Sequence, residues 1–319
     1  MLAAALGDLT GKVDSAFLTA FLAPAAVAVL GVSAMVVVHA GVEPALAWMH
    51  AFTAMEQGIV LLIVAIGTMV IAFMLRALSA TVLEFFAGVV LPSWMTARMT
   101  SGQIAARQRS RRQVESAIAA GSRDLATQQR LLAHTARFPL DEARTGPTRL
   151  ANVMSAIDDH PRRTFNMNGY FWLSRLLPLL PDTYQASLKD GIAPVMGFLN
   201  LGLILAGLGM GWGAFLAFSD GQIALAASAI IGGLLLARGC YLAAVNQTMH
   251  VAEQISVAFD LYHNVILTHL GIPVPATREE ELALWAKLEE RFADESRIGP
   301  FGLLRATGDV NPGPVPPQP

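Results

Sequence analysis

The chain has 319 residues, of which 54% are hydrophobic and only 14% are charged, and its mean hydropathy is +0.50. A water-soluble protein of this size would expose too much apolar surface, so this composition excludes an ordinary soluble enzyme and favours a membrane protein. The net charge of −2 argues against a dedicated nucleic-acid binder, which would be strongly basic. A single cysteine, Cys240, excludes an internal disulfide framework and a multi-cysteine zinc site.

Four largely uncharged stretches are long enough to cross a bilayer, for which about 20 helical residues suffice. They predict helices at about 15–40, 57–91, 192–219 and 221–237. The first stretch is too long to be the apolar centre of a cleaved signal peptide, so we expect it to remain in the mature chain. The sequence thus predicts an all-α fold with four transmembrane helices in two hairpins. A helical cytoplasmic region would be built from the central insert and the C-terminal helices.

This pattern divides the chain into five segments. They are a first transmembrane hairpin (1–92), a cytoplasmic helical insert (93–191), a second transmembrane hairpin (192–247), cytoplasmic C-terminal helices (248–307) and a disordered tail (308–319). The stretch 238–270 has no helix breaker after Gly239, so we expect the fourth helix to continue beyond the membrane until Gly271 and Pro273. Thr277 and Glu280 are spaced as a capping box that starts one more helix.

The distribution of cations predicts the orientation in the membrane. Residues 93–192 hold 14 of the 22 Lys and Arg residues, whereas the connection 40–56 holds none. Because cytoplasmic segments are enriched in Lys and Arg, we expect an inner-membrane, multi-pass protein with both termini and the insert in the cytoplasm. Residues 93–192 carry a net charge of +6 and residues 248–319 a net charge of −5, so the two can pack together.

The insert begins with a basic helix that carries an apolar stripe. The stripe consists of Val114, Ile118, Leu125 and Leu132, and Pro139 would end the helix. Such a stripe must be buried against the chain itself or against a partner subunit, so we expect a homo-oligomer or a cytoplasmic protein partner besides the lipid bilayer. The basic residues fit a positive-inside signal that also attracts anionic lipid. Residues 98–137 contain no aromatic side chain, which argues against nucleic-acid binding. The basic residues are Arg98, Arg107, Arg109, Arg111 and Arg112.

Several short motifs follow one another in the remaining chain, beginning with Pro147-Thr148-Arg149-Leu150-Ala151-Asn152. The others are Trp172 with Arg175-Leu176, Leu179-Leu180-Pro181, Ala258-Phe259-Asp260-Leu261-Tyr262, Leu270-Gly271-Ile272-Pro273, and Glu279-Glu280-Glu281 with Trp285. Together they resemble a family of uncharacterised bacterial inner-membrane proteins with a Pro-Thr-Arg-Leu-Gly-Asn motif. The resemblance implies a multi-pass membrane protein with a helical cytoplasmic insert, and it implies no activity, cofactor or site.

The chain departs from that family's pattern at three places. Ala151 stands where glycine is usual, and His263 stands where an arginine usually follows the tyrosine. The run Phe165-Asn166-Met167-Asn168 replaces a tyrosine-glycine run. If these positions bind something, this chain would bind it differently.

Few residues have the spacing that catalysis requires. His250, Glu253, Asp260 and His263 share one helical stripe and are weak candidates for a metal site, although a partly solvated polar face explains them better. The run Asp158-Asp159-His160 before Pro161 could supply a general base or a metal ligand, but it also fits turn and cap chemistry. We therefore expect no catalytic residue, no resident metal and no cofactor.

Polar and small residues in the third apolar stretch predict close packing of helices. Asn200 must find a hydrogen-bond partner on another helix, and Gly202, Gly209 and Gly213 would let two helices approach each other. No charge lies near the middle of any of the four stretches. These features favour a non-enzymatic oligomeric scaffold or sensor with a cytoplasmic helical platform. An oligomeric ion channel and a metal-dependent membrane enzyme remain as alternatives, the former by analogy of topology with bestrophin-type channels.

Overall fold

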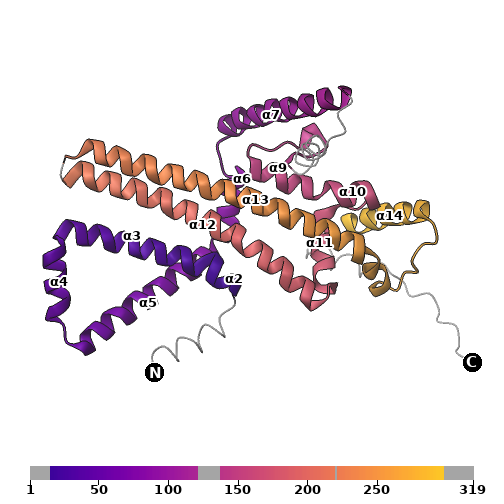
Figure 1. Cartoon of the computed structure of the whole chain (residues 1–319). Coiled ribbons are helices and arrows are strands. Elements are labelled where there is room, and N and C mark those ends of the chain that lie inside the picture. Colours follow the sequence, from indigo (N-terminus) through magenta and orange to yellow (C-terminus); the bar gives the residue numbers. More distant parts are fainter. Residues whose placement is uncertain (1–14, 121–136, 220, 298–319) are drawn as a thin grey trace, which may run out of the picture. The chain divides into compact units, whose positions relative to one another are not determined.

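The computed structural model describes residues 15–120, 137–219 and 221–297, and every regular element within them is helical. The predicted all-α fold is thus confirmed. The chain divides into two compact units: unit 1 comprises Met1–Ile157 and Leu180–Ala258, and unit 2 comprises Asp158–Leu179 and Phe259–Pro319. The predicted insert therefore contributes to both units. Figure 1 gives the helix labels. The predicted tail lies outside the described residues.

Four helical stretches of the described residues are long and apolar enough to cross a membrane. They are Ser15–Ala40, α5 Ala54–Ala77, α12 Asp182–Ser219 and α13 Ile223–His269, the first of them made of α2 Ser15–Phe17, η1 Leu18–Leu22 and α3 Ala23–Ala40. The four predicted apolar helices are confirmed. With its 47 residues, α13 is about 70 Å long, more than twice the thickness of a hydrocarbon core. The predicted continuation of this helix beyond residue 237 is confirmed as well.

Pro24 changes the hydrogen bonding of the first candidate span. In a regular α-helix the N–H of residue 24 would donate to the carbonyl of Ala20, but proline has no N–H. The chain forms a π-helical turn, η1, just before Pro24, and the buried Asn200 of α12 donates from Nδ2 to the Ala20 carbonyl at 2.9 Å. Gly197 allows this approach, because a Cβ there would lie 2.7 Å from the carbonyl oxygen of Thr19. The prediction that Asn200 binds another helix is confirmed.

Asn200→Leu is expected to lower the free energy of unfolding by about 1–3 kcal/mol, because it leaves the Ala20 carbonyl buried without this donor. Pro24→Ala returns an N–H to the helix, so Asn200→Leu should cost less in that background. Chemical unfolding of both single variants and the double variant in lipid–detergent micelles measures the coupling. An equal cost of Asn200→Leu in the two backgrounds would contradict this role of the asparagine.

The connection 40–56, which the sequence predicted as a short turn, is partly helical. It contains a further helix, α4 Val42–Ala51, which follows Gly41 with its φ of 86°. A capping box then starts α5: Thr53 Oγ1 accepts from the Glu56 N–H at 3.4 Å, and the Glu56 carboxylate accepts from the Thr53 N–H at 2.8 Å. The spacing of threonine and glutamate is the sequence signature of this start, which the prediction missed.

The second helix, predicted as one element at 57–91, is two helices. After α5 the chain turns at Leu78 into α6 Ser79–Ala87. Gly88 ends α6 in the left-handed conformation with φ of 83°, and its N–H donates to the Phe85 carbonyl at 3.0 Å. Leucine is not a helix breaker, and a lone glycine also occurs inside helices, so the apolar run alone gave no sign of these ends.

Helices α12 and α13 lie side by side and approach most closely at glycines (Figure 1). A Cβ on Gly209 would lie 2.8 Å from the Cα of Gly233, and a Cβ on Gly213 would lie 2.4 Å from the Cγ1 of Ile230. Gly202 also faces α13, because a Cβ there would lie 3.3 Å from the carbonyl oxygen of Ala237. The three predicted packing glycines therefore do allow close contact.

The remaining helices build the parts of the chain outside the four apolar stretches. Unit 1 adds α7 Ser93–Ala119, η2 Glu142–Arg144 and α9 Arg149–Ile157. Unit 2 contains α10 Asp159–Phe165, α11 Gly169–Leu176, η3 Leu177–Leu179, α14 Arg278–Arg297 and the end of α13. The predicted capping box at the start of α14 is confirmed: the Glu280 N–H donates to Thr277 Oγ1 at 3.3 Å, and the Thr277 N–H donates to the Glu280 carboxylate at 3.3 Å.

Candidate functional site

The Pro147–Asn152 motif forms the start of α9 and joins it to the end of α6 in unit 1. Thr148 caps α9, because its Oγ1 accepts from the Ala151 N–H at 3.1 Å and also donates to the Ala87 carbonyl at 3.2 Å. The proline of the motif packs against Gly88, where a Cβ would lie only 2.8 Å from the proline Cγ. The motif thus fixes two helix ends to each other.

The rest of the motif binds α7 and α13. Asn152 is fully buried, and its Nδ2 donates to Oε1 of Gln103 on α7 at 3.2 Å. The Leu150 N–H donates to the Tyr241 hydroxyl on α13 at 3.2 Å. Arg149 alone among the polar side chains of the motif is exposed. It is therefore the motif residue that is available to a ligand, while the others hold it in place.

Thr148→Val is expected to lower the free energy of unfolding by about 1–2 kcal/mol, since it keeps the shape of the side chain but removes the cap and the bond to α6. Thr148→Ser keeps the hydroxyl and should stay close to the wild type. Thermal unfolding of the detergent-solubilised protein compares the two variants. The assigned role of the hydroxyl is wrong if both variants lose the same stability.

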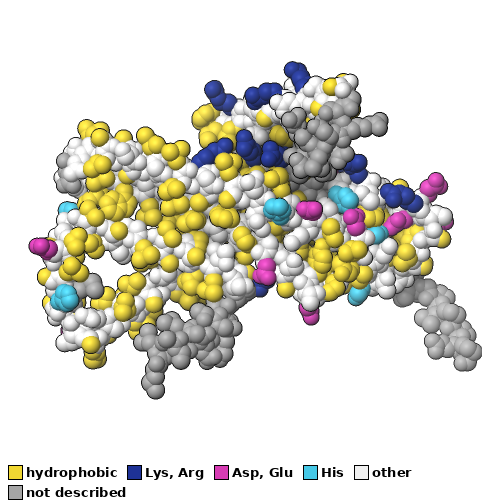
Figure 2. All heavy atoms as spheres, viewed as in Figure 1, with side chains coloured by type: hydrophobic (Ala, Val, Ile, Leu, Met, Phe, Trp, Pro, Cys, Tyr) yellow, Lys and Arg dark blue, Asp and Glu magenta, His cyan; other side chains and the backbone are white. Residues whose placement is uncertain are grey.

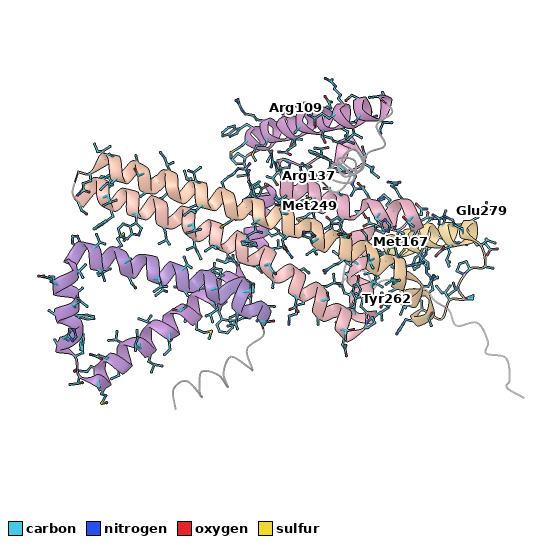
Figure 3. All side chains as sticks on the ribbon, in the orientation of Figure 1. Arg109, Arg137, Met167, Met249, Tyr262 and Glu279 are labelled. Atoms are coloured by element: carbon cyan, nitrogen blue, oxygen red, sulfur yellow. The ribbon has the colours of Figure 1, made fainter. Side chains whose placement is uncertain are left out.

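Three arginines line a cavity of about 450 Å³ in unit 1, formed by α7, residues 137 and 138, α9 and α13. They are Arg109, Arg137 and Arg149, and no acidic side chain is found among the described residues that line the cavity. Figure 3 labels Arg109 on α7 and Arg137, and Figure 2 shows Lys and Arg side chains gathered over this part of unit 1. Guanidinium groups without a nearby carboxylate produce a positive potential that attracts anions.

A second cavity, of about 370 Å³, shares Arg149 and Gln103 with the first. Its other charged lining residue is Arg238, whose guanidinium carbon lies 5.6 Å from the ring centroid of Tyr241. The tyrosine ring in turn stacks on Phe86 with 6.0 Å between centroids. The remaining lining residues are largely apolar: Phe85, Leu91, Met95, Met99, Pro147 and Thr148. This cavity therefore combines an apolar wall with two arginines, Arg149 and Arg238.

The cavity arginines differ from the buried arginine of the same region. Arg109, Arg137, Arg149 and Arg238 are exposed, and none forms an ion pair within the described part of the chain. Arg107, predicted as part of the lipid-attracting basic stretch, is instead buried and is part of the packing of α7. Its Nη1 lies 3.0 Å from the carboxylate of Glu142 in η2, and its Nη2 donates to the backbone carbonyl of Leu140, just before η2. The ion pair explains this burial, because a buried charge needs a partner.

The apolar stripe of the insert is only partly what the sequence predicted. Val114 is buried and lines the first cavity, but Ile118 is 55% exposed. Leu125 and Leu132 lie outside the described residues. Within the described part of α7, only Val114 of the stripe is buried. Ile118 is an exposed apolar side chain that a partner could cover.

The aromatic residues that the motifs singled out form the core of unit 2. Trp172 and Trp285 are fully buried, with ring centroids 5.0 Å apart and an interplanar angle of 75°. Phe292 lies on the same face of α14, 5.8 Å from the Trp172 ring. The guanidinium of Arg175 covers the ring of Phe171 at 3.7 Å and donates to its carbonyl at 2.9 Å. These residues therefore stabilise the packing of α11 and α14.

Two asparagines make the tight turn between α10 and α11. Asn166 ends α10 with φ of 58°, a left-handed conformation that asparagine tolerates better than most residues. Asn168 then caps α11, because its Oδ1 accepts from the Phe171 N–H at 3.2 Å. The run that replaces a tyrosine-glycine run thus has a structural role in this chain.

In the acidic pair before Pro161, Asp158 holds the turn between α10 and α11. Asp158 is buried, and its Oδ2 accepts from Nε and Nη2 of Arg162 at 3.0 and 2.9 Å. Its other oxygen accepts from the Gly169 N–H at the start of α11. With these donors bound, the Asp158 carboxylate orients α10 and α11, which agrees with the turn and cap interpretation.

The four weak metal candidates do not come together. His250 and Glu253 are exposed. Asp260 pairs with His160 at 2.7 Å, while the buried His263 has its Nδ1 2.6 Å from a backbone carbonyl and its Nε2 2.8 Å from the carboxylate of Glu281. The described residues contain no cluster of three or more His, Cys, Asp or Glu side chains that could hold a metal ion.

Sequence reasoning singled out Arg149 but missed the residues that surround it. Arg137 and Tyr241 come from segments far apart in the chain, and no local spacing relates them to the motif. Family models, curated proteins and solved structures gave no match to this chain. A proposal for function therefore depends on the geometry of the described residues.

Proposed function

We propose that the chain is a non-enzymatic membrane sensor whose helical platform binds an anionic ligand in the two adjoining cavities. The observation that carries this proposal is that the charged side chains of both cavities, among the described residues, are all arginines. A cavity with only cations can bind an anion, but it offers no carboxylate or imidazole to move a proton. In unit 2, His160 with Asp260 joins α10 to α13, and His263 with Glu281 joins α13 to α14.

The proposal places the cavities on the cytoplasmic side of a bacterial inner membrane. Both termini and residues 93–192 would lie inside, because this stretch holds 14 of the 22 Lys and Arg residues. The candidate spans support a multi-pass protein. In this arrangement the arginines face the negative surface potential of the inner leaflet, which would concentrate anionic ligands near them.

Anion binding is tested with a fluorophore in the first cavity. Cys240→Ser removes the native thiol, and Gln113→Cys then places a bimane label on a residue that lines the cavity. We expect pyrophosphate to change the emission saturably, beyond the effect of chloride at equal ionic strength. Arg109→Gln and Arg149→Gln should each weaken the response about tenfold, as expected for a charge-assisted hydrogen bond.

Arg112→Gln is the matched control for the anion experiment. Arg112 is exposed on α7 and carries the same charge, but it lines neither cavity. Its replacement should leave the response to pyrophosphate unchanged. A response that falls equally in all three variants would reflect surface charge alone, and the absence of any response in the labelled parent would contradict the proposed sensor.

The platform should also assemble, either with copies of itself or with a cytoplasmic protein. Ile118 offers an exposed apolar side chain on α7. A photoreactive amino acid at residue 118 is expected to trap a discrete adduct in intact cells, whereas the same group at Glu253, on the polar face of α13, should give less. Equal, diffuse labelling from the two positions would contradict assembly through α7.

A further inference from the structure

The wall of the second cavity is unusual for a site that binds only a small anion. Five side chains supply an apolar surface: Phe85, Phe86, Leu91, Met95 and Met99. Phosphate alone would leave this apolar surface in contact with water, which is unfavourable. The cavity therefore suits a ligand with an apolar part and a charged part.

The chain positions of the lining residues relate this cavity to the edge of the membrane. Arg238 is the first charged residue after the apolar stretch 221–237 of α13. Trp94, next to the lining residue Met95, is 70% exposed at the start of α7, and exposed tryptophans favour the interface between hydrocarbon and water. The positions of Arg238 in the cavity and of Trp94 beside a lining residue thus fit the depth of lipid headgroups.

The cations occupy the part of the cavity that adjoins its neighbour. Arg149 lines both cavities. A ligand whose anionic group binds Arg149 could therefore extend both along the apolar wall and into the arginine-lined cavity. Tyr241 holds this arrangement, because its hydroxyl accepts the Leu150 N–H at 3.2 Å and its ring lies 5.6 Å from the guanidinium of Arg238. The two guanidinium groups are therefore presented from α9 and α13.

We propose that the two cavities together bind an anionic phospholipid of the inner leaflet. Its phosphate would contact Arg149 and Arg238, and the first part of an acyl chain would lie against the apolar wall. An anionic headgroup would extend toward Arg109 and Arg137 in the first cavity. The volumes of about 370 and 450 Å³ accommodate the headgroup and the adjacent chain segments, while the remaining chains stay in the bilayer. This inference rests on the proposed sensor and names its ligand.

Native mass spectrometry of the full chain in detergent tests this inference with phosphatidylglycerol, phosphatidylcholine and inorganic phosphate as separate probes. We expect phosphatidylglycerol to remain bound at concentrations where phosphatidylcholine does not. Arg149→Gln and Arg238→Gln should each weaken phosphatidylglycerol binding about tenfold. Arg112→Gln should leave it unchanged. Circular dichroism and size-exclusion chromatography check that each exposed-arginine variant remains folded.

A double variant of the apolar wall separates a lipid from free phosphate. Met95→Gln with Met99→Gln should weaken phosphatidylglycerol binding but spare the pyrophosphate response of the labelled first cavity. Equal binding of phosphatidylglycerol and phosphatidylcholine, or no effect of Arg149→Gln, would overturn the lipid inference. If pyrophosphate still binds through Arg109 and Arg149, the proposed sensor survives with a soluble ligand; if it does not, the proposed function fails independently.

Discussion

Trp172→Ala is expected to lower the free energy of unfolding by about 3–5 kcal/mol, as is typical for a large aromatic residue removed from a core. The side chain is fully buried and packs edge to face against Trp285, which is equally buried. Trp172 lies on α11, which has only eight residues, so its packing depends on few other contacts that could compensate for the cavity. Trp285→Ala should have a similar effect, and the two losses should not add because the rings touch.

Hydrogen exchange of α11 and α14, together with chemical unfolding, measures this effect. Trp94→Ala is the control, because Trp94 is 70% exposed and should change stability little. Trp172→Phe should cost clearly less than Trp172→Ala, since the indole N–H has no hydrogen-bond partner in the described structure and only volume is lost. A Trp172→Ala variant as stable as Trp94→Ala would contradict an aromatic core in unit 2.

Gly209→Ala and Gly211→Ala are expected to change stability in opposite directions although they lie two residues apart in α12. A methyl group on Gly209 would meet the Cα of Gly233 at 2.8 Å and the carbonyl oxygen of Ala229 at 2.9 Å. Because backbone atoms cannot move aside as a side chain can, this change should cost roughly 1–3 kcal/mol. A methyl group on Gly211 would meet no atom within 4 Å. Because alanine has a higher helix propensity than glycine, Gly211→Ala should stabilise the protein by up to about 1 kcal/mol.

Unfolding of the two alanine variants in lipid–detergent micelles compares them with the wild type. Gly207→Ala is a second control, because a Cβ on Gly207 also has open space. Equal effects at Gly209 and Gly211 would show that the glycines act through helix propensity alone. Gly233→Ala should resemble Gly209→Ala, since each would push on the Cα of the other.

The sequence predicted those parts of the fold that depend on local composition. Uninterrupted apolar runs predicted the four long helices, and the capping box at Thr277 predicted the start of α14. It did not predict the end of α5 at Ala77, because Leu78 lies in an apolar stretch without a breaker. It did not predict the separate helix α4 either, although Gly41 and Pro44 are local signals of a helix end and a new helix start. The sequence predicts Arg107 as part of the lipid-attracting basic stretch, since no local pattern indicates its buried pairing with Glu142, 35 residues away.

The candidate site was predictable only in part for the same reason. Motif resemblance pointed to Arg149, and the requirement for a buried amide to be satisfied pointed to a partner for Asn200. The partner itself, the carbonyl of Ala20, is 180 residues away. Arg137 and Arg238 come to the site through tertiary packing, which neither periodicity nor spacing describes.

Cysteine accessibility in cells gives the most direct test of a membrane sensor whose arginine cavity faces the cytoplasm. In the Cys240→Ser background, Gln113→Cys should react with a membrane-impermeant maleimide only after the inner membrane of spheroplasts is permeabilised. Glu43→Cys, in the cation-free connection 40–56, should react in intact spheroplasts. Labelling of residue 113 in intact spheroplasts, with residue 43 protected, would place the cavity on the outer side and contradict the proposed sensor.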